Sequence, residues 1–251
     1  MAKTTFWSGV AAVIYFPTSQ MITLYLYHHK DPDIEQYIGE NLEQVIKNQE
    51  KKIGISYPSE RPKIEYAFPE DGIRLGYGGL YNVGEDTIYL PSGLLTKPRG
   101  DFNDFVATVF TFNNTFDAKR VLDHELAHFY CDKVLEQKLG KNYHLFHAPL
   151  FRSDEEYIAR KLIDEGIARY VENVMNGEDK KAFPLDKWPS KIEDFSYDVI
   201  YNGGYAMVKP VIDEHKEKGI LFLLFYPPVS EEIFQPKGYQ ERILTSIEKS
   251  L

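Results

Sequence analysis

The pentapeptide H-E-L-A-H, residues 124–128, lies inside a segment, about 117–139, whose apolar spacing is typical of one long helix. Residues four apart lie on one face of a helix, so the imidazoles of His124 and His128 can point at the same ion. Leu122 and Phe129 belong to an apolar stripe on this segment, which predicts that the helix is buried. A buried pair of histidines at this spacing indicates a metal site at the centre of the fold.

A chance origin of the pattern is the alternative. From the histidine and glutamate content of the chain, an accidental H-E-x-x-H is expected at about one per cent. An accidental copy has no reason to fall in the middle of a helix between apolar neighbours, as this one does. The position therefore favours the metal site. Glu125 lies one step round the helix, within reach of a metal-bound water without being a ligand itself.

A hydrolytic zinc site needs three protein ligands and one open position. A compact third histidine six residues after His128 is absent, because Val134 occupies that place. A second helix, about 153–175, offers Glu165 instead. Glu165 shares a helical face with Ile158 and Leu162, which would pack on the first helix. Gly166 beside it allows another backbone to approach closely. We therefore expect His124, His128 and Glu165 to form the ligand set.

The first half of the chain predicts strands around one helix. The helix opens at Asp31-Pro32, closes at Gly54, and has apolar residues at helical spacing between them. Alternating or apolar runs bounded by turn residues predict strands at 21–29, 63–68, 73–83 and 87–91. These segments indicate a small mixed sheet with a helix packed on it.

The second half of the chain is predicted to be mostly helical. Besides the two helices already described, helical spacing covers about 205–218, which ends at Gly219, and a closing segment at 239–251. Residues 220–228 form a buried apolar segment between them, and no conformation is predicted for 92–116. A sheet followed by helices predicts an α+β fold with a cleft between the two parts.

Composition excludes several classes of protein. A chain of 251 residues with 43% hydrophobic and 27% charged residues is in the globular range. The net charge of −9 argues against a nucleic-acid partner, because phosphate binding needs a surplus of Lys and Arg. A single cysteine, Cys131, excludes an intrachain disulfide framework, and we interpret it as a buried structural thiol.

The N-terminal segment is apolar, and residues 1–20 have some features of a leader. Lys3 is a minimal basic region, but polar residues and Pro17 interrupt the apolar run, which falls short of the roughly 20 residues of a spanning helix. No small-residue cleavage site follows it. The pattern disfavours a membrane anchor, and a cytoplasmic location is slightly favoured over export.

H-E-L-A-H on one helix and D-E-G-I-A-R-Y, residues 164–170, on the next resemble the gluzincin metallopeptidases, the clan of thermolysin and the aminopeptidase N class. The resemblance implies Zn²⁺ held by His124, His128 and Glu165, and peptide hydrolysis by a metal-activated water with Glu125 as general base. It also implies one zincin-like domain over 21–251, in which a sheet-bearing lobe, 21–116, and a mostly helical lobe, 117–251, enclose the active-site cleft.

Two further segments resemble the clan. L-G-Y-G-G-L-Y-N, residues 75–82, is similar to its glycine-bearing edge strand, which implies that the backbone at Gly78 and Gly79 binds an extended peptide; a β-bulge is the alternative. Y-N-G-G, residues 201–204, resembles the segment whose tyrosine stabilises the oxyanion. This points to Tyr201, with Tyr205 as the alternative donor or a substrate contact.

Two other functions compete with an active peptidase. A catalytically weak or inactive gluzincin-like domain would bind a peptide or protein partner without cutting it. Hydrolysis of a non-peptide amide is a further alternative. The presence of Glu125 favours an enzyme, because a pure binding domain has no need of a general base. The substrate, the choice between endopeptidase and exopeptidase, and the oligomeric state stay open, although the exopeptidase signature G-x-M-E-N is absent.

Overall fold

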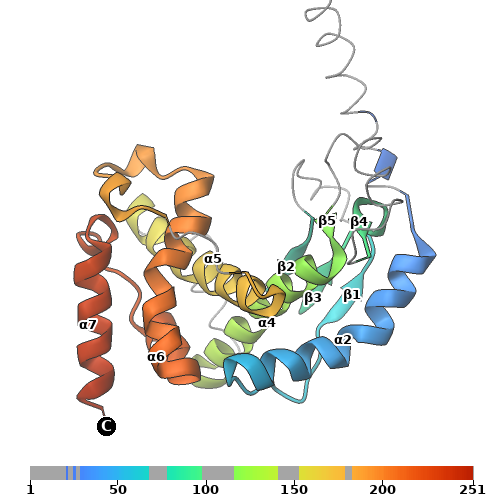
Figure 1. Ribbon diagram of the computed structural model, residues 1–251, viewed down its shortest axis with the longest axis horizontal. Helices are drawn as coiled ribbons and strands as arrows, with labels where there is room; N and C mark the ends of the chain where they lie inside the picture. Colours follow the sequence, from blue (N-terminus) through green and yellow to red (C-terminus); the bar gives the residue numbers. More distant parts are fainter. Residues whose placement is uncertain are drawn as a thin grey trace, which may run out of the picture. The chain divides into compact units, whose positions relative to one another are not determined.

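The structure is a computed structural model, and it describes residues 21, 25–26, 29–67, 78–97, 116–140, 153–178 and 183–250 (Figure 1). The described chain forms two compact units, whose segments alternate along the sequence. The first unit contains the described residues of Met1–Leu42, Lys63–Leu80 and Thr87–Leu122, and the second contains those of Glu43–Pro62, Tyr81–Asp86 and Asp123–Leu251. Among the described helices, none has both the length and the apolar character needed to cross a membrane.

A small sheet lies in the first half of the chain. Its strands are β1 (Lys63–Glu65), β2 (Leu80–Asn82) and β3 (Thr87–Tyr89), in the order β1-β3-β2. β1 and β3 are parallel, and Ile64 lies opposite Ile88. β2 and β3 are joined by a turn at residues 83–86. The combination of helices with this small sheet confirms the α+β class.

A second pair of strands begins after a short 3₁₀ helix, Ser92–Leu94. β4 (Leu95–Thr96) pairs in parallel with β5 (Phe116–Asp117), the strand that leads directly into the helix of the H-E-L-A-H pentapeptide. Neither strand is predicted from the sequence, because two residues are too few to establish an alternating pattern.

Helix α2 (Pro32–Ile53) has the bounds that its end signals predict. The side chain of Asp31 accepts hydrogen bonds from the backbone N–H groups of Asp33 and Ile34, at 3.0 and 3.3 Å, and so caps the first turn. Gly54 ends the helix with a φ of +78°, a conformation that favours glycine.

The second unit is built from helices. They are α4 (Ala118–Leu139), which starts in the first unit, α5 (Asp154–Asn176), α6 (Gly204–Phe225) and α7 (Pro236–Glu248). A short π-helix, η5 (Val199–Gly203), leads directly into α6. α6 packs on both α5 and α7, and the core between them is apolar. The largest buried side chains of this core include Tyr130, Leu162 and Tyr239.

Capping fixes both ends of α5. The hydroxyl of Ser153 accepts a hydrogen bond from the backbone N–H of Glu156 at 3.3 Å and so caps the first turn. Gly177 ends the helix in the left-handed conformation, with a φ of +66°. The predicted range of this helix is therefore confirmed to within a residue at each end.

α5 and α6 cross with their backbones in contact at Gly166 and Gly204. A Cβ atom on Gly166 would lie 2.6 Å from the carbonyl oxygen of Gly204, and one on Gly204 would lie 2.4 Å from that of Leu162. No side chain fits at either position. This contact confirms that Gly166 allows a second backbone to approach, and it brings η5 next to the helix that carries Glu165.

Two predicted segments differ from the structure. The strand expected at 21–29 is wrong, because Met21, Tyr25 and Leu26 are helical and the N–H of His29 bonds to the carbonyl of Tyr25 at 2.9 Å. Residues 220–225 continue α6 instead of following its end, beyond a kink at Lys216 with a φ of +52°. Residues 73–77 and the possible leader, 1–20, lie outside the described residues.

Candidate metal centre

The segment of α4 that carries the histidines is anchored by buried polar contacts within the second unit. The side-chain amide of Gln49 donates to the carbonyl and carboxylate oxygens of Asp123, at 3.2 and 3.0 Å. The hydroxyl of Tyr57 donates to the carbonyl of Leu126 at 3.0 Å. Buried hydrogen bonds of this kind fix the rotation of a helix about its axis. They hold one face of α4 toward α5.

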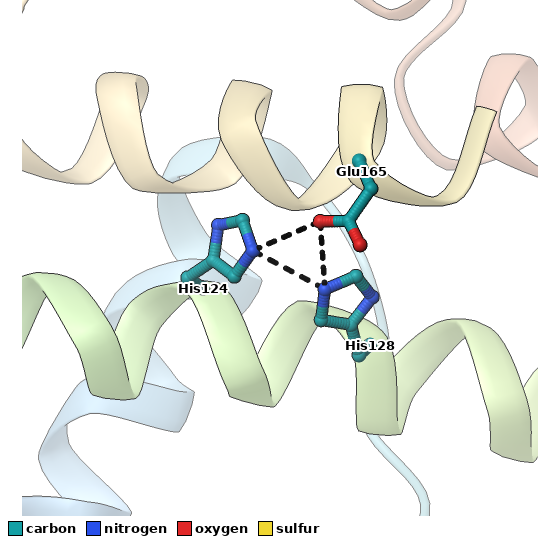
Figure 2. A group of neighbouring side chains, drawn as sticks. All are labelled: His124, His128 and Glu165. Atoms are coloured by element: carbon teal, nitrogen blue, oxygen red, sulfur yellow. Dashed lines mark hydrogen bonds and ion pairs between the residues drawn. The ribbon is translucent and has the colours of Figure 1, made fainter. Parts of the chain in front are cut away.

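His124 and His128 on α4 point at Glu165 on α5 (Figure 2). The two Nε2 atoms are 3.2 Å apart, and Glu165 Oε2 lies 3.3 Å from that of His124 and 3.5 Å from that of His128. Ligands about 2.0–2.1 Å from a tetrahedral zinc ion are separated from one another by about 3.3–3.4 Å. The three atoms therefore have the separations that a zinc ion between them requires.

The hydrogen bonding of these three atoms tests whether a metal fits. Glu165 is 6% exposed, and its Oε2 is buried without a hydrogen-bond partner among the described residues. The outer nitrogens of both imidazoles face carboxylates, so an Nδ1–H on each ring would leave a lone pair on each Nε2. Three acceptor atoms then converge with no donor between them. A cation satisfies all three, so the residues fit a metal ion.

A carboxylate lies behind each imidazole. Asp164 Oδ1 is 3.0 Å from Nδ1 of His128, and Glu172 Oε2 is 3.4 Å from Nδ1 of His124. Arg169 donates to both carboxylate oxygens of Glu172, at 2.9 and 2.7 Å, and so fixes its orientation. Such carboxylates select the tautomer of a metal-binding histidine and orient its ring.

These carboxylates also change the pKa of the histidines in the metal-free protein. Burial alone would lower the pKa of His124, but Glu165 and Glu172 outweigh it and raise that pKa to about 9. Asp164 and Glu165 likewise overcome burial and raise the pKa of His128 well above its ordinary value. Without a metal, protons take the place of the cation in this cluster.

The two carboxylate oxygens of Glu165 face different groups. Oε1 accepts a hydrogen bond from Nζ of Lys161, one helical turn earlier, at 3.0 Å. Oε2 faces the two histidines (Figure 2). Burial opposes the charge on Glu165, but the histidines and Lys161 prevail and hold its pKa well below the usual value. The carboxyl is therefore ionised, as a metal ligand must be.

Glu125 lies next to His124 in sequence and is 7% exposed. Burial raises the pKa of its carboxyl, while the two histidines and a hydrogen bond from the Tyr81 backbone oppose that shift. Glu125 does not belong to the group whose ligand atoms converge. It is thus beside the predicted metal position without being a ligand, which is what the role of a base requires.

Tyr201 stacks on His124 of the candidate metal centre. Its ring lies 6.0 Å from that of His124, with 10° between the planes, and the exposed Tyr197 also stacks on it at 4.0 Å. Burial and the charge of Glu165 raise the pKa of Tyr201, so its hydroxyl stays protonated as a donor. Tyr205 is instead 3% exposed and lies in the apolar core. Of the two predicted donors, Tyr201 is the one beside the histidines.

Gly78 and Gly79 belong to the first unit, whereas the metal centre belongs to the second. Packing within its own unit explains why residue 78 is a glycine. A Cβ there would lie 2.7 Å from Cγ of Phe116, so the ring requires glycine at this position. A role of either glycine in peptide binding stays a prediction.

Four residues of the centre are not predicted from the sequence: Lys161, Asp164, Arg169 and Glu172. A signal for two of them is present, because Asp164 adjoins Glu165 and Glu172 follows it by two helical turns on the same face.

Asp132 is buried and accepts a hydrogen bond from Tyr81 at 2.6 Å, so it does not face solvent.

Comparisons of the chain with protein-family models, with curated proteins and with solved structures found no match. The residues of the centre are therefore the whole basis for a functional proposal.

Proposed function

We propose that this protein is a zinc-dependent peptidase in which His124, His128 and Glu165 hold the ion and Glu125 is the general base. One observation carries the proposal: three acceptor atoms converge, and Glu165 Oε2 is buried without a hydrogen-bond partner among the described residues. Two histidines and a glutamate are the ligand set of hydrolytic zinc sites, which keep a fourth position open.

When bound, Zn²⁺ in such a site lowers the pKa of a water in its open position and polarises the carbonyl of the substrate. Glu125 accepts the proton of the attacking water and returns it to the leaving amine. Its burial supports this role, because a carboxyl of raised pKa holds a proton closer to neutral pH.

Tyr201 is the proposed donor to the oxyanion. Its ring stacks with those of His124 and Tyr197, and its hydroxyl stays protonated because of burial and the charge of Glu165. A fixed hydroxyl aimed at developing negative charge stabilises a tetrahedral transition state. The zincin-like fold and the binding of an extended peptide along Gly78 and Gly79 stay predictions of the resemblance.

The test compares the wild type with Glu125→Gln, and with Glu193→Gln as a control at an exposed glutamate. Each protein is loaded with Zn²⁺, its metal content is measured, and cleavage of a broad peptide library is followed by mass spectrometry with and without chelator. We expect about one zinc per chain in all three, and a loss of cleavage of about 10²-fold or more in Glu125→Gln alone.

Two results would contradict the proposal. A wild type that retains no zinc after reconstitution removes the metal centre. Chelator-sensitive cleavage that is unchanged in Glu125→Gln removes the base. A wild type that holds zinc and binds peptides but cuts none would favour the binding domain instead.

A further inference from the structure

Lys161 lies one turn before Glu165 on α5, and its ammonium group contacts the carboxylate that faces the histidines. Nζ is 3.0 Å from Glu165 Oε1, and the lysine side chain is 37% exposed, whereas that of Glu165 is 7% exposed. The charge of Asp164, which orients His128, adds to that of Glu165 in favouring the charged lysine. Lys161 is therefore held at the edge of the metal centre by its contact with Glu165.

The contact leaves only one oxygen of Glu165 for a metal. A carboxylate can bind a cation through one oxygen or through both. Here Oε1 accepts a charge-assisted hydrogen bond from Lys161, and Oε2 faces the two Nε2 atoms without a partner among the described residues. Rotation of the carboxylate to bring both oxygens toward the histidines would break the contact with Lys161.

We propose that Lys161 is a positioning residue that restricts Glu165 to one-oxygen ligation and so keeps a coordination position free for water and substrate. This inference rests on the metal centre of the proposed function. A two-oxygen carboxylate would fill the position that a hydrolytic zinc site has to keep open.

Helix stability alone does not account for the pair. Pairs four residues apart stabilise a helix best when the acidic residue comes first, and here the lysine comes first. α6 has a pair of the same order, Lys209 and Asp213, with Nζ 2.6 Å from Oδ2. That carboxylate is 47% exposed and does not belong to the histidine cluster. The second pair therefore provides a matched control.

The test uses Co²⁺ in place of zinc, because its visible absorption weakens as the number of ligands rises above four. The full-length wild type, Lys161→Met, Lys161→Arg and Lys209→Met are saturated with Co²⁺, and their spectra are recorded. X-ray absorption then counts the ligand atoms around cobalt. Zinc affinity is measured by competition with a chelator, and circular dichroism confirms that each variant is folded.

We expect Lys161→Met to gain one oxygen ligand and to lose visible intensity, because the freed oxygen of Glu165 can turn toward the metal. Lys161→Arg keeps a charged donor and should retain the wild-type spectrum, as should Lys209→Met. A Lys161→Met spectrum and ligand count equal to those of the wild type overturn the inference and leave the metal centre intact. A wild type that binds neither metal overturns the proposed function together with it.

Discussion

Gly166 and Gly204 are in backbone contact where α5 crosses α6, and a Cβ on Gly166 would lie 2.6 Å from the Gly204 carbonyl oxygen. We predict that Gly166→Ala lowers the free energy of unfolding by about 1–3 kcal/mol, because the methyl group must push the two helices apart. Denaturant titration monitored by circular dichroism measures the change.

Gly39→Ala is the control for this substitution. Gly39 lies inside α2 and is exposed, and a Cβ there would have no atom within 4 Å outside its own helix. Alanine at this position should raise the free energy of unfolding by about 0.5–1 kcal/mol through helix propensity alone. Effects of the same sign in both variants would contradict the close crossing.

Glu172 fixes His124 from behind, and its removal should weaken metal binding without removing a ligand. We predict that Glu172→Gln binds zinc about 10–100-fold more weakly than the wild type in chelator competition. Glu156→Gln, on the same helix and with a side chain that is 40% exposed, should bind zinc like the wild type. Equal affinities in all three proteins would mean that Glu172 does not support the centre.

Tyr201→Phe and Tyr205→Phe distinguish the two candidate oxyanion donors. Loss of one such donor lowers kcat by about 10²–10³-fold. We expect this loss in Tyr201→Phe, with zinc content unchanged, because Tyr201 stacks on His124. Tyr205 lies in the core, so Tyr205→Phe should retain its kcat. The reverse pattern, measured on any peptide that the wild type cleaves, would move the role to Tyr205.

The metal-free protein should become less stable as pH rises from about 6.5 to about 9. The pKa of His124 is about 9 in the folded chain, because Glu165 and Glu172 outweigh burial, against about 6.5 when unfolded. The stabilisation of its charged form is complete below the unfolded value and is lost as pH rises through the folded value. Thermal unfolding across this range, with and without His124→Gln, measures the effect.

Zinc binding should follow the opposite trend over the same interval. The ion needs a neutral imidazole, so its affinity is expected to rise with pH as the proton leaves. Chelator competition at several pH values checks this. A zinc affinity that is flat between about pH 6.5 and 9 would show that His124 holds no proton for the metal to displace.

Asp132, one helical turn after His128 on α4, provides a second pH-dependent contribution. Burial is the main cause that raises the pKa of its carboxyl to about 7, and one of its oxygens has no hydrogen-bond partner among the described residues. The unfolded chain loses this proton first, at about pH 4, so stability falls between about pH 4 and 7. Relative to Asp132→Asn, the wild type should lose about 1–3 kcal/mol of unfolding free energy over this range.

Asp213→Asn is the matched control, because Asp213 also accepts a hydrogen bond from a tyrosine, Tyr170, at 2.8 Å. Lys209 and Tyr170 overcome the effect of burial and lower the pKa of Asp213. Its stabilisation is therefore present above the unfolded pKa and is lost as pH falls. Between about pH 4 and pH 8, which lie above this loss, Asp213→Asn should therefore differ from the wild type by a nearly constant amount in denaturant titrations, whereas the difference for Asp132→Asn should change.

Local signals predict the helices well, since their ends depend on neighbouring residues. Asp31, Gly54, Ser153 and Gly177 each act within one turn, and the structure has helix ends at all four. Gly219 is predicted to end a helix and does not. A Cβ there would lie 2.7 Å from the carbonyl oxygen of Val211, so this glycine serves close packing inside α6. Sequence alone does not separate these two uses of glycine.

The segment 21–29 shows the limit of periodicity. A short apolar run satisfies a helix and a strand about equally well, and the described residues Met21, Tyr25 and Leu26 are helical.

The ligand triad is predictable because two members share one helix. Lys161 and Arg169 pair with Glu165 and Glu172 of their own helix, and helical spacing allows many such pairs, so the sequence does not single these two out.

His124 contacts Glu172 and His128 contacts Asp164, so the earlier histidine of α4 pairs with the later carboxylate of α5. The two helices are therefore antiparallel here. A slip of one helix along the other by a single turn, about 5.4 Å, would break both contacts and separate Glu165 from the histidines. Only correctly aligned helices can then capture the ion. If the proposed metal centre is correct, the amount of metal that the protein retains would therefore measure the fraction of molecules in which α4 and α5 have the correct alignment.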